Sequence, residues 1–126
     1  MSASVKRIAY LLRAVAEPTR ARLLKALLDR ELCVCELMDA LQIPQYKVSR
    51  HLAVLKRAGL VTHRRQGLWT YYSLPTGAKT DPVLRDVLRL IEAHVEDDRI
   101  VAADLARLQR RLALRVNGRC VVGSTN

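Results

Sequence analysis

Residues 44–74 read PQYKVSRHLAVLKRAGLVTHRRQGLWTYYSL, and the pattern of apolar residues changes partway through this stretch. The first half predicts a helix, because its apolar residues recur at helical spacing: Val48, Leu52 and Leu55. Gly59 is expected to end that helix, since glycine is common just past a helix end. The segments LVTHRR and LWTYYSL that follow favour strands and are joined through a Gln-Gly pair, which predicts a hairpin. A helix followed directly by a hairpin therefore decides the fold.

Further helices are expected on both sides of this unit. Apolar periodicity predicts them over 5–16, 18–29 and 33–41, and predicts one long helix from about 82 to about 115. The helix over 33–41 and the helix after it are separated only by the short turn QIPQ. Two such helices and a hairpin predict a mainly α, winged helix-turn-helix fold whose second helix enters the major groove.

The length of 126 residues predicts a single domain. We expect this domain to span residues 1–116, and residues 117–126 to form a flexible tail that carries Cys120. No run of 18 apolar residues is present, which argues against a membrane helix, and the N-terminal residues do not read as a signal peptide. The expected location is the cytoplasm, where thiols stay reduced.

The net charge of +10 is concentrated in the middle of the chain. Between Asp39 and Asp81 there is no acidic residue, whereas the same window holds seven basic ones: Lys47, Arg50, Lys56, Arg57, Arg64, Arg65 and Lys79. A surface that is merely solvated usually mixes both signs. The acid-free window therefore predicts a face that binds a polyanion such as double-stranded DNA.

The predicted recognition helix directs several polar side chains outward or to its flanks: Gln45, Tyr46, Lys47, Ser49 and Arg50. Arg50 can make a paired contact to guanine, and Gln45 can do the same to adenine. Lys47 and Ser49 suit phosphate. For each of them the alternative is a solvated surface residue.

The tip of the predicted hairpin carries a second set of candidate DNA contacts: Arg64, Arg65, Gln66 and Gly67. Arg64 and Arg65 are expected to reach backbone phosphates or the minor groove. The aromatic residues of the hairpin are expected to pack within the wing and the core rather than to stack on bases: Trp69, Tyr71 and Tyr72.

The segments ELCVCEL, EPTRARLLKAL, KVSRHLAVLKRAGLV and RRQGLWTYYSL together resemble the ArsR/SmtB family of bacterial winged-helix repressors, and within it the arsenic-responsive members. The resemblance covers roughly residues 5–75 by motif and the last helix by position. It implies a homodimer through the first and last helices that binds operator DNA and releases it when a metal or metalloid binds. Two positions depart from the pattern: Met38 stands where a third cysteine is usual, and Pro44 replaces a small polar residue at the start of the recognition helix.

The chain has three cysteines, Cys33, Cys35 and Cys120. Thiolates are the preferred ligands of soft ions such as arsenic(III) and antimony(III), and a helix N-terminus favours thiolate formation. Side chains two residues apart in a regular helix point about 200° from each other. Cys33 and Cys35 can therefore share one ion only if they lie in an unformed first turn or if binding unwinds that turn. The alternative is that a cysteine is a small buried apolar residue.

The arsenic of arsenite takes three ligands, and the start of the 33–41 helix offers two sulfurs. We expect Cys120 to supply the third by folding back or by crossing the dimer. If Cys120 is instead an incidental exposed thiol, the remaining two-thiolate site suits a methylated arsenical such as methylarsenite better than free arsenite.

Other functions remain open at this point. The cysteines could form a redox switch in a winged-helix repressor, although a disulfide within Cys-x-Cys closes a strained ring. A thiol oxidoreductase would have no use for the basic window. A constitutive architectural DNA binder would leave the cysteines unexplained. The sequence contains no Ser-His-Asp set, phosphate loop or paired catalytic carboxylates that would predict an enzyme.

Overall fold

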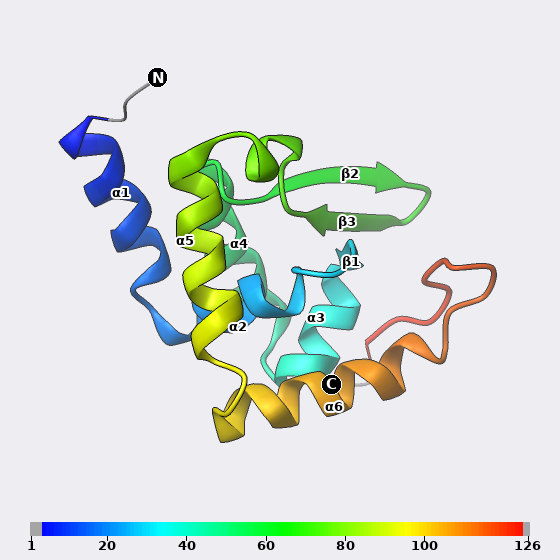
Figure 1. Ribbon diagram of the computed structural model, residues 1–126. Helices are drawn as coiled ribbons and strands as arrows, with labels where there is room; N and C mark the ends of the chain where they lie inside the picture. Colours follow the sequence, from blue (N-terminus) through cyan, green and yellow to red (C-terminus); the bar gives the residue numbers. More distant parts are fainter. Residues whose placement is uncertain (1–3, 125–126) are drawn as a thin grey trace.

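The computed structural model describes residues 4–124, so the outer ends of the predicted domain and tail, 1–3 and 125–126, lie outside it. In chain order the elements are α1 (Val5–Val15), α2 (Pro18–Ala26), β1 (Leu32–Cys33), α3 (Val34–Leu41), α4 (Gln45–Arg57), β2 (Thr62–Gln66), β3 (Trp69–Ser73), the 3₁₀ helix η1 (Thr76–Lys79), α5 (Pro82–His94) and α6 (Arg99–Leu112). Figure 1 shows α1 beside α5, the β2–β3 wing projecting away from them, and α6 crossing beneath α3. None of the described helices is long and apolar enough to cross a membrane.

The predicted helix-turn-helix is confirmed as α3 and α4. The left-handed conformation of Gln42, with φ 57°, ends α3, and Pro44 immediately precedes α4. The predicted inner face of α4 is fully buried, with Val48, Leu52 and Leu55 each 0% exposed. Helix α2 packs against α4, α5 and α6, so it lies at the centre of the apolar core.

The predicted hairpin is confirmed, and it belongs to a three-stranded antiparallel sheet in the order β1-β3-β2. Gly67 takes the left-handed conformation that the tight turn requires, with φ 60°. Strand β1 was not predicted, because two residues are too few to display an alternating pattern. It pairs Leu32 with Tyr72 and Cys33 with Tyr71. The segment before α3 is thereby joined directly to the wing.

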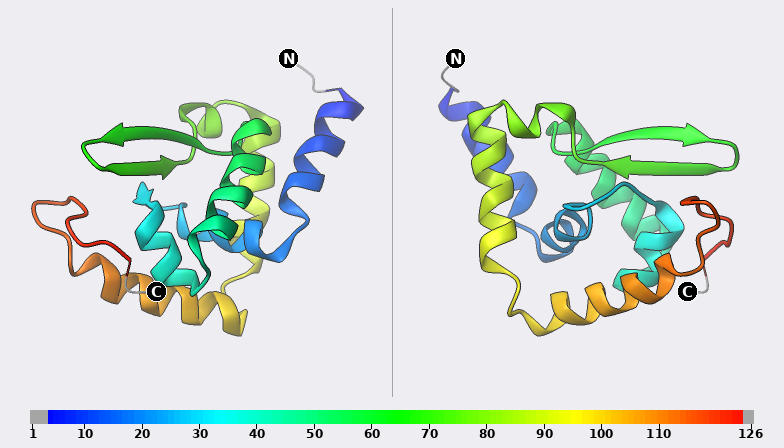
Figure 2. Two further views of the ribbon diagram at one scale, coloured as in Figure 1. Left: turned by 180° about the vertical axis from the view of Figure 1, so that it is seen from behind. Right: turned by 45° about the vertical axis from the view of Figure 1, so that its right-hand side comes forward.

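The prediction of one continuous C-terminal helix is wrong. Helix α5 ends at His94, and α6 begins at Arg99 in a new direction (Figure 2). The side chain of Asp98 accepts hydrogen bonds from the backbone N–H groups of Ile100 and Val101, at 2.8 and 3.0 Å. This N-cap offers the backbone an alternative to a continuous helix.

The break changes where the apolar residues of the predicted 82–115 helix pack. Leu84, Leu88 and Ile91 are buried inside this chain, so they are already shielded from water without a second subunit. Helix α6 packs across α3, and the residues after it turn back toward the wing (Figures 1 and 2). The segment that was predicted to be a flexible tail therefore packs against the domain, because Cys120 and Ser124 both have partners there.

Candidate functional site

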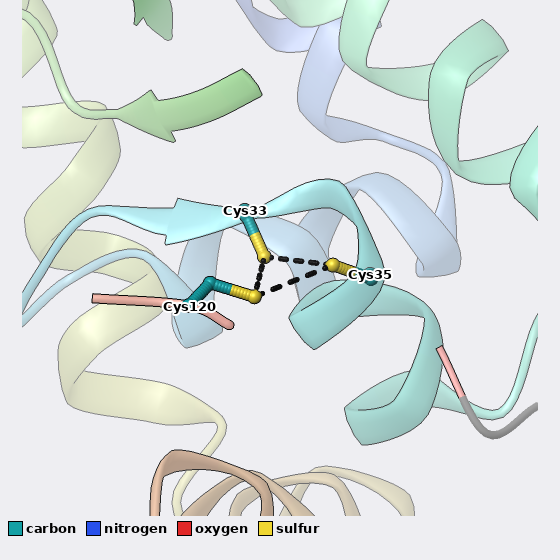
Figure 3. A group of neighbouring side chains, drawn as sticks. All are labelled: Cys33, Cys35 and Cys120. Atoms are coloured by element: carbon teal, nitrogen blue, oxygen red, sulfur yellow. Dashed lines mark hydrogen bonds between the residues drawn. The ribbon is translucent and has the colours of Figure 1, made fainter. Parts of the chain in front are cut away.

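The three cysteines meet at one point between β1, the start of α3 and the C-terminal segment (Figure 3). The Sγ atom of Cys33 lies 2.9 Å from that of Cys35 and 3.0 Å from that of Cys120, and the Cys35–Cys120 sulfur distance is 3.5 Å. All three are free thiols. Their exposed fractions are 1% for Cys33, 9% for Cys35 and 2% for Cys120, so the cluster is almost closed to solvent.

The start of α3 explains how Cys33 and Cys35 converge. Cys33 is the N-cap residue and has an extended backbone, φ −82° and ψ 163°, whereas Cys35 is the second residue of the helix. The 200° separation of a regular helix does not apply between a residue outside the helix and one inside it. The structure matches neither of the two alternatives in full, because the first turn of α3 is formed from Val34 onward and only Cys33 lies outside it, so the two sulfurs meet while α3 is intact.

Cys120 is brought to the pair by a tight turn after α6. Asn117 and Gly118 have positive φ angles of 53° and 72°, and the backbones of Val116 and Arg119 form a bridge across the turn. The backbone N–H of Cys120 then donates a 2.9 Å hydrogen bond to the hydroxyl of Tyr71. Since Tyr71 also pairs with Cys33 across the sheet, a single wing residue contacts both cysteine segments.

Two ion pairs to α3 lie beneath the sulfurs, one from Arg111 in α6 and one from Arg115 in the segment that follows α6. Arg115 donates to both carboxylate oxygens of Glu36 at 2.6 Å, and Glu36 also accepts the backbone N–H of Cys33 at 2.9 Å. Arg111 donates to Asp39 at 2.7 Å and points a second guanidinium nitrogen toward the Cys120 sulfur, 3.7 Å away. Charged groups are rarely buried unless they are paired in this way.

The charges and hydrogen bonds of the cluster favour one thiolate shared among three sulfurs. Hydrogen bonding with Cys33 and Cys120 and the positive charge of Arg111 lower the pKa of Cys35 to about 6, against the effect of burial. The pKa of Cys33 is raised, first by its hydrogen bond with Cys35 and then by burial, and burial raises the pKa of Cys120. Cys35 is therefore the cysteine whose ionisation this environment favours most.

An open cleft of about 280 Å³ adjoins the Cys33–Cys35 side of the cluster. We call it the sulfur cleft, and the residues that line it are Cys33, Val34, Cys35, Met38, Gln45, Leu68, Trp69, Thr70, Gly123 and Ser124. Its walls thus come from α3, the first residue of α4, the wing and the C-terminal segment.

The predicted DNA contacts on α4 are all exposed: Gln45, Tyr46, Lys47, Ser49 and Arg50. His51 lies beside the buried face, and its Nδ1 is 3.2 Å from a guanidinium nitrogen of Arg20. On the wing, Arg65 and Gly67 are exposed and Gln66 is half-buried. These positions suit DNA binding, but contact with DNA stays a prediction.

Arg64, unlike Arg65, forms an ion pair within the chain. It forms an ion pair with Glu31, with 2.9 Å between Nε and Oε2, and its guanidinium carbon lies 4.8 Å from the centre of the Tyr71 ring. This ion pair lowers the pKa of Glu31. Phosphate binding by Arg64 therefore stays a prediction, and it requires this ion pair to open.

Sequence reasoning missed several residues that build the site: Glu36, Asp39, Tyr71, Arg111 and Arg115. Tyr71 was assigned to packing only, although its hydroxyl holds Cys120. The four charged residues looked like solvated surface. A signal was present, since Glu36 and Asp39 are three residues apart and Arg111 and Arg115 are four apart. It can be read only when the two segments are known to pack together.

Comparison with known proteins agrees with this architecture. Residues 17–63 match the bacterial regulatory protein arsR family. The chain is 38% identical to the arsenic resistance transcriptional regulator ArsR1 of Pseudomonas putida over 96 residues, which are 74% of this chain and 75% of that protein.

Two solved structures extend the agreement to the fold. HlyU from Vibrio cholerae matches with a TM-score of 0.64 and 32% identity, over 76% of this chain and all of that one. The homodimeric winged helix-turn-helix domain of a possible ArsR-family regulator from Mycobacterium bovis matches with a TM-score of 0.60 and 26% identity, over 75% of this chain and 87% of that one. This chain therefore belongs to the ArsR/SmtB family of winged-helix transcriptional repressors.

Proposed function

We propose that this repressor leaves its operator DNA when trivalent arsenic or antimony binds to the thiolates of Cys33, Cys35 and Cys120. The observation that carries the proposal is the meeting of three thiols, two of them 87 positions apart, within 3.5 Å of one another. Sulfurs bound to one soft ion at about 2.3 Å each lie no more than about 4.6 Å apart. The cluster therefore needs little rearrangement to hold one ion. The arsenic resistance role of the Pseudomonas putida relative supports the same ligand.

The chemistry is an exchange of water for sulfur. Arsenite, As(OH)3, forms three As–S bonds as three As–O bonds break, and the oxidation state of arsenic does not change. The three hydroxides leave as water, two with the thiol protons of Cys33 and Cys120 and one with a proton from solvent. The thiolate of Cys35 is the first nucleophile, since it is the sulfur with the lowered pKa. Arg111 balances the negative charge of the sulfurs until arsenic neutralises them.

The site is coupled to the DNA-reading elements by direct contacts. Cys33 lies in β1, which pairs with β3 of the wing, and Cys35 lies in α3, which packs on α4. An ion that fixes the three sulfurs changes the position of the wing relative to α4. The repressor releases its operator if the ion-bound conformation binds DNA less tightly than the ion-free conformation does.

We propose that the protein forms a homodimer through α1 and α5. The interface was expected to use one long terminal helix, and α5 is the first of the two helices into which that segment is divided. Helix α1 leaves large apolar side chains exposed, with Val5 84%, Ile8 40% and Leu12 46% accessible, and α5 adds Leu90 at 53%. The Mycobacterium bovis neighbour is homodimeric. Two recognition helices then bind half-sites about one DNA turn, or a multiple of one turn, apart.

A redox switch is the second candidate function, and the distance between the Cys33 and Cys120 sulfurs favours a disulfide between these two residues. The Cys33 and Cys120 sulfurs are 3.0 Å apart, so a disulfide between them avoids the small ring of Cys-x-Cys. Hydrogen peroxide would oxidise the two thiols to the disulfide and be reduced to two waters. The same cytoplasmic location serves both functions, because thiols stay reduced there until the signal arrives.

Operator binding by the purified full chain tests the proposal, with arsenite, antimonite, methylarsenite, zinc and hydrogen peroxide compared in parallel. We expect arsenite and antimonite to release DNA, and we expect Cys33→Ser and Cys35→Ser to abolish that release. Met38→Leu is the matched control: it should keep the wild-type response, since the thioether is not a ligand. Release by peroxide alone would move the assignment to the redox switch.

A further inference from the structure

The sulfur cleft lies beside the cysteine cluster, and the site described above does not use it. Cys33 and Cys35 line this cleft, whereas Cys120 does not. The pair Cys33–Cys35 thus has two different neighbours, the Cys120 sulfur (Figure 3) and the cleft.

Trivalent arsenic has three bonds and one lone pair. Once two bonds go to Cys33 and Cys35, one bond and the lone pair remain, and they point in different directions. When the third bond is made to Cys120, the ligand is inorganic arsenite. When arsenic carries an organic group in place of one hydroxyl, the third bond is an As–C bond that sulfur does not replace, so this group needs a space of its own.

We propose that the sulfur cleft receives the organic substituent of trivalent organoarsenicals, R–As(OH)2, and that an aryl group such as phenyl fits it best. This proposal rests on the proposed function, since Cys33 and Cys35 still bind the arsenic. Two As–S bonds form as two As–O bonds break, the two hydroxides leave as water with the thiol proton of Cys33 and one proton from solvent, and the As–C bond stays intact. Cys120 takes no part in this mode.

The walls of the cleft suit a hydrophobic substituent. Val34, Met38 and Leu68 provide aliphatic and thioether surface, and Trp69 provides an indole ring that packs against the cysteine cluster. Aromatic groups pack favourably on such a ring and on the sulfur of methionine. An apolar cavity of about 150 Å³ already admits benzene. The sulfur cleft, at about 280 Å³, has room for a phenyl group.

An occupant of the cleft also contacts the DNA-reading elements. Gln45 is the first residue of α4, and Leu68 lies in the turn of the wing. A phenyl group between them would press on the recognition helix and the wing together. We therefore expect phenylarsenite to release DNA without the help of Cys120.

Gly123 offers a way to block the cleft without disturbing the sulfurs. It lines the cleft, its φ is not in the left-handed region, and a Cβ added there meets no atom within 4 Å. Gly123→Leu therefore places a side chain at the cleft without backbone strain. Gly77→Leu is the matched control, because Gly77 has the same freedom but lies in η1, outside the cleft.

The experiment measures the dissociation constants of phenylarsenite and arsenite for the full chain, followed by the emission of Trp69, the single tryptophan. In Gly123→Leu, phenylarsenite should bind roughly tenfold to a hundredfold more weakly, the range expected for one buried phenyl-sized group. Arsenite should bind as in the wild type, and Gly77→Leu should change neither. Leu68→Ser, at a residue that is 86% exposed, should weaken phenylarsenite alone by a smaller factor.

Unchanged phenylarsenite binding in both cleft variants would overturn the proposal. Equal weakening of both arsenicals in Gly123→Leu would overturn it too, because the cleft would then not be distinct from the three-sulfur site. In either case the proposed function survives if arsenite still releases DNA from the wild type. Failure of the wild type to bind arsenite is a different result, and it refutes the proposed function itself.

Discussion

Replacing Arg115 with methionine tests whether the α6–α3 contact supports the cysteine site. The change keeps much of the side-chain volume but removes the guanidinium group that holds both carboxylate oxygens of Glu36. Glu36 is 0% exposed, so its carboxylate would stay buried and keep the 2.9 Å hydrogen bond from the backbone N–H of Cys33 without the guanidinium group. Removing one member of a buried ion pair typically destabilises a protein by about 3–5 kcal/mol.

The expected result is a fall in melting temperature of roughly 10–20 °C for a chain of this size. Circular dichroism of the wild type and Arg115→Met gives this difference directly. Arg110→Met is the control, since Arg110 is an exposed arginine in α6, shortly before Arg115, and should change stability by less than about 0.5 kcal/mol. The double variant Glu36→Gln with Arg115→Met should recover much of the loss, because it no longer buries an unpaired charge. Equal melting temperatures for the two arginine variants would refute the reasoning.

Further predictions concern DNA, charge and assembly. Arg50→Ala should weaken binding to the true operator by about 1–3 kcal/mol and relax preference at one base position, which competition with altered operators measures. Arg65→Ala should instead weaken binding to specific and random DNA alike and lower the salt slope by about one, so a loss confined to one sequence would argue against phosphate contact. Arg111→Met should raise the pKa of Cys35 from about 6, seen as slower alkylation at neutral pH, because a positive charge beside the thiolate is lost. Leu12→Glu should yield monomers in sedimentation at micromolar concentration, and a wild-type monomer under those conditions would remove the dimer proposal.

The sequence predicted the winged helix-turn-helix because its evidence is local. The buried face of α4 is set by Val48, Leu52 and Leu55. The change in the spacing of apolar residues after Gly59 predicts the hairpin. The two-residue strand β1 could not be predicted, because it exists only by pairing with β3. The break before α6 was missed, although Asp98 is a good N-cap residue, because apolar residues continue at helical spacing beyond it.

The candidate site likewise has a part that local sequence predicts and a part that depends on contacts between distant segments. Cys33 and Cys35 attracted attention through their spacing and the resemblance to the family. The approach of Cys120 depends on the direction of α6, on the turn at Asn117 and Gly118 and on Tyr71, none of which local sequence determines. The ion pairs beneath the sulfurs were hidden for a related reason, since a charged residue is expected at the surface until its partner is known.

The number of sulfurs bound to arsenic tests the central claim most directly. X-ray absorption on the arsenite-loaded wild type should give three sulfur neighbours and no oxygen, and Cys120→Ser should give two sulfurs and one oxygen. The same variant should need more arsenite and antimonite to leave the operator, while its response to methylarsenite stays close to that of the wild type. Two sulfurs and one oxygen in the wild type, unchanged in Cys120→Ser, would contradict the three-thiolate site.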